Sequence, residues 1–273
     1  MNIILVLKAI IIAIVEGITE FIPISSTGHM IIVGNVINFK GAFATSFEVV
    51  IQLGAILAII VLYWDKIWNS VVDFFKAKPS GLKFWTNIIV AFLPAAVLGF
   101  LFNDKIDKYL FNPFTVALAL VVGGILMIII ENKFRDKYTT KNIEQISIKQ
   151  SLKIGCFQCF ALWPGMSRSA STIMGGWICG VSTVAATEFS FFLAIPTMVG
   201  ATALTLYKSG MNYNMGEIIT LVIGFVVAFL VALIVVEKFV SYLKKKPMKV
   251  FAIYRIIVGV ALLGLIQFGV ISL

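Results

Sequence analysis

The sequence is poor in charge, in cysteine and in histidine. Only 13% of its 273 residues are charged, and it has a single histidine and three cysteines. So little charge beside 60% apolar residues excludes an ordinary soluble domain and indicates a polytopic membrane protein. Three cysteines are too few for an extracellular disulfide framework. Cys156 and Cys159 lie in an apolar run that indicates neither a redox site nor a metal site.

Acidic residues are scarcer than basic ones. The chain has 13 Asp and Glu against 22 Lys and Arg, and its formal net charge is +9. Most of the basic residues lie in loops between apolar runs, which is typical of membrane topology and of contact with anionic lipid. We therefore expect membrane lipids, and no nucleic acid, as partners.

Six apolar runs approach the roughly 20 residues that a helix needs to cross a bilayer. They cover about 44–63, 86–102, 114–130, 184–207, 216–236 and 250–271. The sequence thus predicts an all-α polytopic membrane protein with six transmembrane helices.

Two further apolar segments are too short or too broken to span. Residues 3–22 are stopped by Pro23 and followed by the short run 30–37, and residues 152–163 are stopped by Pro164 before 172–181. A short helix, a polar turn and a second short helix are typical of a re-entrant hairpin. We predict two such hairpins, over 3–38 and 152–181.

The two halves of the chain resemble each other. Pro23-x-x-Ser26 matches Pro164-x-x-Ser167 at an offset of 141, and residues 44–47 match 186–189 at an offset of 142. A hairpin and three spans make an odd number of crossings, so the second unit would enter the bilayer upside down.

This pattern predicts one membrane domain, 1–273, built as an inverted-topology repeat. Unit 1 covers approximately 1–130, a charged linker covers 131–151, and unit 2 covers approximately 152–273.

The basic residues predict the orientation of the chain. Under this scheme fifteen Lys and Arg fall in the segments 65–85, 131–153 and 237–249, and five fall on the other side. The richer side is expected in the cytoplasm. Both termini are then outside the cell.

Glu16 and Glu20 stand four residues apart in an apolar stretch, so one helix face carries both. A charge at membrane depth costs roughly 2.5 to 3.5 kcal/mol on insertion scales, which favours a functional reason for it. Paired carboxylates suit Mg²⁺ or Ca²⁺. The alternative is that they are polar groups lining a water-filled cleft.

Hydroxyl groups and the histidine follow at once, in Ser25, Ser26, Thr27 and His29. His29 lies one helical turn after either serine, so its ring is expected near a hydroxyl that it could activate as a nucleophile. Spacing does not choose between Ser25 and Ser26. A simple helix cap and a structural histidine are the alternatives.

A second turn of the same form, residues 164–169, contains Arg168. Each turn opens a half-helix at its N-terminus, where free amides favour anions. Two such ends meeting near Arg168 would form a phosphate-sized pocket, whereas a snorkelling arginine is the alternative. Four other polar residues stand in apolar surroundings, either around the site or at the repeat interface: Glu48, Gln52, Gln158 and Glu188.

Two motifs of this chain resemble the signatures of the bacterial undecaprenyl-diphosphatase (bacitracin-resistance) family. They are Glu16-Gly17-x-Thr19-Glu20-Phe21-x-Pro23-x-Ser25-Ser26-Thr27-Gly28-His29 and Pro164-Gly165-x-Ser167-Arg168-Ser169. The resemblance covers essentially the whole chain, with one departure at Ala170, where the family usually has glycine. It implies an integral-membrane phosphatase of the bacterial plasma membrane that converts undecaprenyl diphosphate to the monophosphate carrier of cell-wall synthesis.

The resemblance also implies roles for individual residues. The glutamates would serve a divalent cation and acid–base chemistry, the serine matching Ser26 would attack phosphorus, and the arginine matching Arg168 would bind the diphosphate. With the reading above, the expected catalytic residues are Ser26, His29, Glu20 and Arg168. The expected metal ligands are Glu16 and Glu20, and the expected substrate-binding residues are Ser25, Thr27, Ser167, Ser169 and Thr172.

Other readings stay open from the sequence. Inverted repeats with broken helices also build transporters, so a flippase of a polyprenyl phosphate or another anion is one alternative, and an accessory lipid-binding protein is another. The pairs Gly123-Gly124 and Gly175-Gly176 allow close helix contact, either inside one chain or in a homodimer.

Overall fold

The computed structural model describes residues 2–209 and 213–269, and helices make up nearly all of it. This described part contains no β-strand, only an isolated bridge between Thr140 and Val181. The elements are α1 (Ile3–Thr19), α2 (Ser26–Val36), α3 (Ala42–Leu62), α4 (Trp64–Phe75), α5 (Pro79–Leu110), α6 (Pro113–Phe134), the short 3₁₀ helix η1 (Ile143–Gln145), α7 (Ile148–Gln158), η2 (Cys159–Leu162), α8 (Arg168–Ile178), α9 (Thr183–Ser209), α10 (Met215–Leu243) and α11 (Lys249–Gln267).

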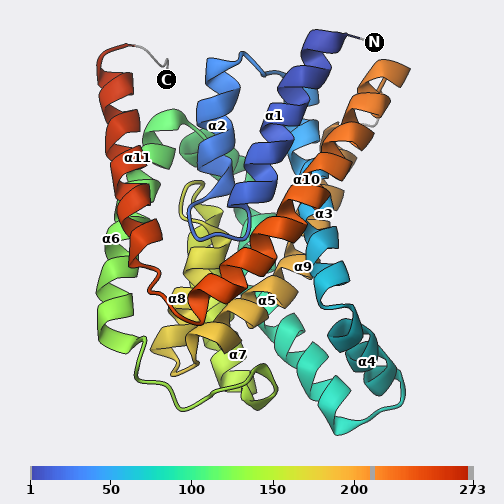
Figure 1. The fold of residues 1–273 in the computed structure, drawn as a ribbon, viewed down its shortest axis with the longest axis vertical. Helices are drawn as coiled ribbons and strands as arrows, with labels where there is room; N and C mark the ends of the chain where they lie inside the picture. The colour runs from blue at the N-terminus through green and yellow to red at the C-terminus, as the bar shows by residue number, and fades with distance from the viewer. Residues whose placement is uncertain (1, 210–212, 270–273) are drawn as a thin grey trace.

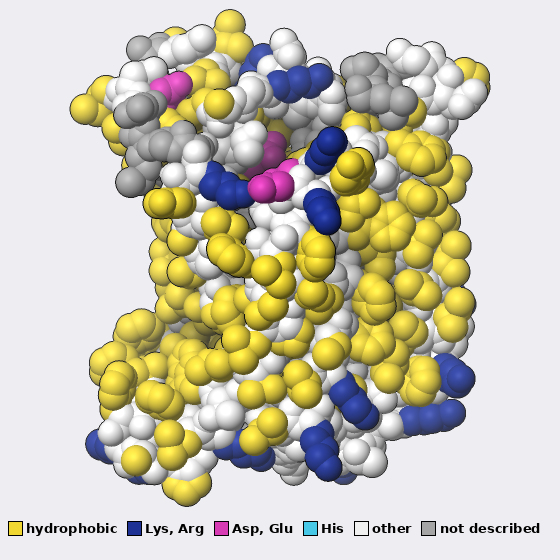
Figure 2. Space-filling model, turned by 180° about the vertical axis from the view of Figure 1, so that it is seen from behind, with side chains coloured by type: hydrophobic (Ala, Val, Ile, Leu, Met, Phe, Trp, Pro, Cys, Tyr) yellow, Lys and Arg dark blue, Asp and Glu magenta, His cyan; other side chains and the backbone are white. Residues whose placement is uncertain are grey.

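Six of these helices are long and apolar enough to cross a membrane: α3, α5, α6, α9, α10 and α11. They coincide with the six predicted runs, so the all-helical class and the six spans are confirmed. The last helix ends at Gln267, and positions 270 and 271 of the predicted run lie outside the described residues. Figure 2 shows hydrophobic side chains across the middle of one face, with Lys and Arg toward its ends.

Two short helix pairs, α1–α2 and α7–α8, complete the fold. The first pair begins at the upper end of the molecule, where α11 ends, and the second begins at the lower end, where α4 also lies (Figure 1). Their turns come together in the middle, because Ser169 Oγ donates to the carbonyl of Phe21 at 2.9 Å. Re-entry into a bilayer and the inverted repeat stay predictions.

The two turns share an uncommon backbone conformation. Ser25 caps α2 with φ 73° and Ser167 caps α8 with φ 68°, and each hydroxyl accepts from the amide three residues later. Left-handed φ values are rare for serine and store strain. The matching caps pair Ser25 with Ser167, at an offset of 142. This offset equals that of the second sequence match and is one residue larger than that of the Pro-x-x-Ser match.

The helix pairs pack on the opposite halves of the molecule. Helix α1 lies against α10, and α7 lies against α5. Glycines allow the close approach, since a Cβ on Gly17 would lie 2.8 Å from the Ala228 carbonyl oxygen, and a Cβ on Gly155 would overlap the Ala91 carbonyl. This reciprocal packing is what an inverted repeat produces.

The two predicted glycine pairs serve contacts within the chain. Gly123 and Gly124 of α6 face α11, and Gly175 and Gly176 of α8 face Phe157 and Ala186. Their small size is therefore accounted for without a second chain, and a homodimer stays a prediction.

Two segments expected as loops are partly helical. Residues 65–85 form α4 and the start of α5, and the linker 131–151 holds the end of α6, η1 and the start of α7. Both contain too many charged residues to read as spans, and α4 has only 12 residues, too few for a crossing.

Candidate active site

A cavity of about 540 Å³ lies where the two turns meet. It extends along α5 and α9 toward their C-terminal ends, to Ile106 and Thr205, which places its far end away from α4 and α7. Apolar side chains such as Phe92, Phe100 and Leu204 line this extension. Most of the polar lining is at or near the turns and includes Glu20, Ser25, Ser26, Thr27, Gln52, Gln158, Ser167 and Arg168. Asn103, Thr197 and Thr205 add polar groups along the helices.

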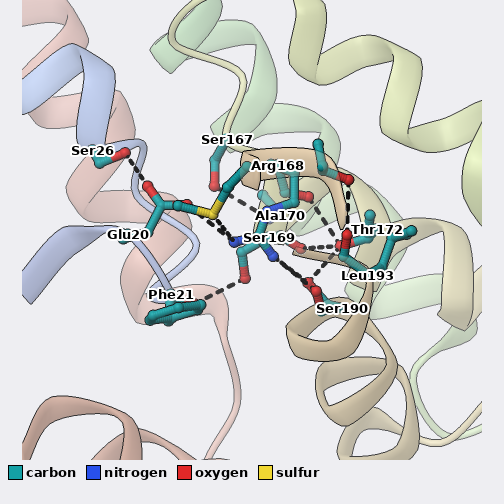
Figure 3. A network of polar contacts seen from close by, with 12 residues as sticks. Glu20, Phe21, Ser26, Ser167, Arg168, Ser169, Ala170, Thr172, Ser190 and Leu193 are labelled. Carbon is teal, nitrogen blue, oxygen red and sulfur yellow. Dashed lines mark hydrogen bonds and ion pairs between the residues drawn. The ribbon is translucent and has the colours of Figure 1, made fainter. Parts of the chain in front are cut away.

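Glu20 joins the two turns at this point. Its Oε2 accepts a hydrogen bond from Ser26 Oγ at 2.5 Å, and its Oε1 lies 3.0 Å from Arg168 Nη2. Figure 3 shows the carboxylate between these two side chains (Figure 3). The ion pair is largely shielded, with side-chain exposures of 11% for Arg168 and 9% for Glu20. One carboxylate therefore contacts both the hydroxyl and the guanidinium that the sequence analysis selected.

The guanidinium of Arg168 is fixed from the second unit. Its Nη1 donates to the carbonyl of Ser190 at 2.9 Å and to Ser190 Oγ at 3.1 Å. It also stands over the ring of Phe21, with the guanidinium carbon 5.7 Å from the ring centre. Contacts on three sides hold the charge at the cavity wall, which excludes the snorkelling alternative.

Glu16 lies one turn before Glu20 and is fully buried. Neither of its carboxylate oxygens has a hydrogen-bond partner within the described residues. A buried carboxylate without partners needs a proton or a cation. The described residues contain no group of three or more His, Cys, Asp and Glu side chains that could hold a metal. The Glu16–Glu20 pair offers the one or two carboxylates by which Mg²⁺ is commonly bound. Of the two, only Glu20 lines the cavity, and Glu16 lies behind it.

The hydroxyls of Ser25 and Ser26 have different surroundings. Ser25 Oγ accepts from the Gly28 amide at 3.3 Å as the cap of α2, whereas Ser26 Oγ donates to Glu20. Both residues line the cavity, together with Thr27 and Ser167. The Glu20 contact distinguishes Ser26 from Ser25, a choice that spacing left open.

Two of the expected substrate-binding residues lie behind the cavity wall. Ser169 and Thr172 have no exposed surface and do not line the cavity. Ser169 Oγ donates to the Phe21 carbonyl, and Thr172 Oγ1 contacts Ser190 Oγ at 2.7 Å. Their hydroxyls are engaged in joining α8 to its neighbours, so the geometry gives them a supporting place rather than the expected contact with phosphate.

His29 also differs from expectation. Its Nδ1 lies 2.7 Å from the Ser25 carbonyl oxygen, and its Nε2 lies 2.8 Å from the hydroxyl of Tyr254. The ring stacks on Tyr254 and does not line the cavity. The expected hydrogen bond to a serine hydroxyl is thus replaced by one to the serine backbone, because the helix points this side chain toward α11.

Sequence reasoning missed three residues around the site: Ser190, Tyr254 and Arg255. Ser190 and Tyr254 are ordinary in a membrane helix and gave no signal. Arg255 did give one, since it is an arginine within an apolar run, as Arg168 is.

Known proteins resemble this chain over nearly its whole length. The family model for bacitracin resistance protein BacA matches residues 9–261. An undecaprenyl-diphosphatase of Clostridium tetani is 62% identical over 269 residues, which cover 98% of this chain and 99% of that protein. One of Clostridium novyi is 57% identical and covers 100% and 99%, and an undecaprenyl-diphosphatase 2 of Clostridioides difficile is 54% identical with the same coverage. The chain is a multi-pass membrane protein that belongs to the bacitracin resistance protein BacA family.

Proposed function

We propose that this protein hydrolyses undecaprenyl diphosphate to undecaprenyl phosphate and inorganic phosphate, in the cavity between the two turns. The activity would return the lipid carrier to peptidoglycan synthesis and confer resistance to bacitracin. The names of the relatives support this reaction. The observation that carries it is the Glu20 carboxylate in contact with both Ser26 Oγ and Arg168.

Ser26 is the proposed nucleophile. Its Oγ attacks the terminal phosphorus while Glu20, at 2.5 Å, takes the hydroxyl proton as general base. The bond from that phosphorus to the bridging oxygen breaks, and the lipid monophosphate leaves with this oxygen. Water then attacks the phosphoserine, which releases inorganic phosphate and restores the hydroxyl. His29 supports the step through its hydrogen bond to the Ser25 carbonyl.

Charge on the phosphoryl oxygens is stabilised from both units. Arg168 supplies the guanidinium, and the N-terminal ends of α2 and α8, which begin at the two turns, favour anions. Phosphoryl transfer depends mainly on such positioning and electrostatic stabilisation. Ser167 and Thr27 stand at the same wall and are proposed to contact phosphate.

A divalent cation, Mg²⁺ or Ca²⁺, is proposed at Glu16 and Glu20. When bound, it would neutralise charge on the diphosphate. The partnerless oxygens of Glu16 support this assignment.

The apolar extension of the cavity suits the lipid tail. The proposed location is the bacterial plasma membrane, with both termini outside. The three Lys- and Arg-rich segments adjoin α4, α7 and the α10–α11 junction, which lie at one end of the molecule (Figure 1). With that end in the cytoplasm, the cavity runs toward the outer face.

Replacement of the nucleophile tests the reaction. Ser26→Ala is expected to lower phosphate release from undecaprenyl diphosphate in detergent by at least about a thousandfold. The matched control is Ser151→Ala, since Ser151 is buried in α7 and does not line the cavity. Full turnover by Ser26→Ala would refute the covalent step. No phosphate release by the wild type, in a preparation that binds the lipid, would favour the transporter alternative.

A further inference from the structure

Arg255 is a fully buried arginine in the interior of α11. Its guanidinium has no carboxylate partner among the residues that the structure describes. Its two terminal nitrogens donate to four backbone carbonyls instead, while its buried Nε has no partner among the described residues. A positive charge held in this way at membrane depth is uncommon and calls for a function.

The four carbonyls come from both turns of the site and from the helix beside them. Nη1 donates to Pro23 of the first turn at 3.4 Å. Nη2 donates to Gly165 and Met166 of the second turn at 3.0 and 2.9 Å, and to Ala119 of α6 at 3.4 Å. One planar fork thus connects the backbone before Ser26 with the backbone before Arg168.

Space for this fork is provided by α6. A Cβ on Gly123 would overlap Nη2 of Arg255, whereas a Cβ on the neighbouring Gly124 would meet Ala252 and Ile256 at 2.7 to 2.8 Å. Gly123 therefore admits the guanidinium, and Gly124 admits only the α11 backbone and an aliphatic side chain.

We infer that Arg255 is a positioning residue for the reaction proposed above: it holds the two turns at the separation that phosphoryl transfer requires. It neither lines the cavity nor contacts the catalytic side chains. Its effect comes through the carbonyls of Pro23, Gly165 and Met166. Lysine cannot replace it, because an ammonium lacks the rigid planar fork that reaches several acceptors at once.

Turnover of three variants tests the inference. Arg255→Lys, Arg255→Met and Gly123→Ala should each lower kcat of the folded protein by about 100-fold with little change in KM, because a misplacement of about 1 Å has this effect. Gly124→Ala is the control for helix packing: it presses on the α11 backbone and not on the guanidinium, so it should lower the Tm and keep kcat of the folded protein within about threefold. A purely structural role would lower the yield or the Tm and leave kcat of the folded protein unchanged.

Deuterium exchange of the same purified proteins gives a readout independent of turnover. Peptides over 21–28 and 163–170 should both exchange faster in Arg255→Met and Gly123→Ala than in the wild type and in Gly124→Ala. Unchanged exchange at either turn, or unchanged kcat in Arg255→Lys and Gly123→Ala, would overturn the inference. If the wild type released no phosphate, the proposed function would fail, and the exchange data would still decide whether Arg255 holds the turns.

Discussion

At the scale of single residues, Glu20 and Glu16 have opposite environments although one helical turn separates them. Both oxygens of Glu20 are engaged, one by Ser26 and one by Arg168, whereas Glu16 is buried without a partner. Glu20 therefore suits proton transfer as well as a share in the proposed cation site, whereas both oxygens of Glu16 are left for the cation.

Metal dependence tests this division. After chelation with EDTA the enzyme should be inactive and should recover with added Mg²⁺. Glu16→Gln should raise the half-saturating Mg²⁺ concentration by about tenfold or more, since an amide is a weaker ligand than a carboxylate. The control is Glu188→Gln, a carboxylate paired with Lys66 on α4, whose Mg²⁺ dependence should match the wild type. An unaltered Mg²⁺ curve for Glu16→Gln would contradict the assignment.

Local sequence predicted part of this residue-scale chemistry. The positions of Glu20, Ser26 and Arg168 within two similar turns were sufficient to predict that these side chains belong to one site. Each of them lies at or near a helix end, so local sequence determines its place. The place of His29 was not predictable, since its partner Tyr254 lies 225 residues away and only the packing of α11 brings the two together.

At the scale of elements, the second turn is built around Gly165. Its φ of 101° lies in the left-handed region, and a Cβ there would approach the Val116 carbonyl oxygen to 2.5 Å. The turn thus lies directly on α6, which fixes where α8 begins and where Arg168 is placed.

Gly165→Ala should abolish phosphate release and lower the Tm. The control is Gly41→Ala, with φ of 99° and no atom within 4 Å of the added Cβ. Both variants incur backbone strain of about 1 to 3 kcal/mol, but only the first pushes the turn away from α6. Thermal unfolding and turnover of the two proteins measure the difference, and equal effects would show that strain alone matters.

Helix α4 shows what composition could not predict. Trp64, Trp68 and Phe75 recur on one face and are exposed, and the two tryptophans stack at 5.8 Å. Aromatic side chains with this spacing are typical of the membrane–water interface. Because the segment is short and charged, a search for spans passes over it.

At the scale of the whole molecule, long apolar runs were a reliable guide, since crossing a bilayer requires length and apolar composition and little else. All six predicted spans are helices. The junction between the units was predictable only in outline, because Arg255 acts through backbone carbonyls that carry no sequence signal.

Orientation is the prediction at this scale. In a variant lacking Cys156, Cys159 and Cys179, Lys108→Cys should react with a membrane-impermeant maleimide in intact cells. Lys245→Cys should react only after permeabilisation, since it lies on the Lys-rich side. Both positions are exposed, so access to reagent differs only by the membrane face. Labelling of residue 245 in intact cells would contradict the predicted orientation.

The reacting groups are divided between the two halves of the chain, with Ser26 and Glu20 on one and Arg168 on the other. The polypeptide passes between these halves once, between α6 and α7. A cut in that connection would leave two fragments. One would hold the Ser26 nucleophile without the guanidinium of Arg168, and the other would hold that guanidinium without a nucleophile. Neither fragment could hydrolyse the substrate alone, and activity would return only when the two fragments reassociate.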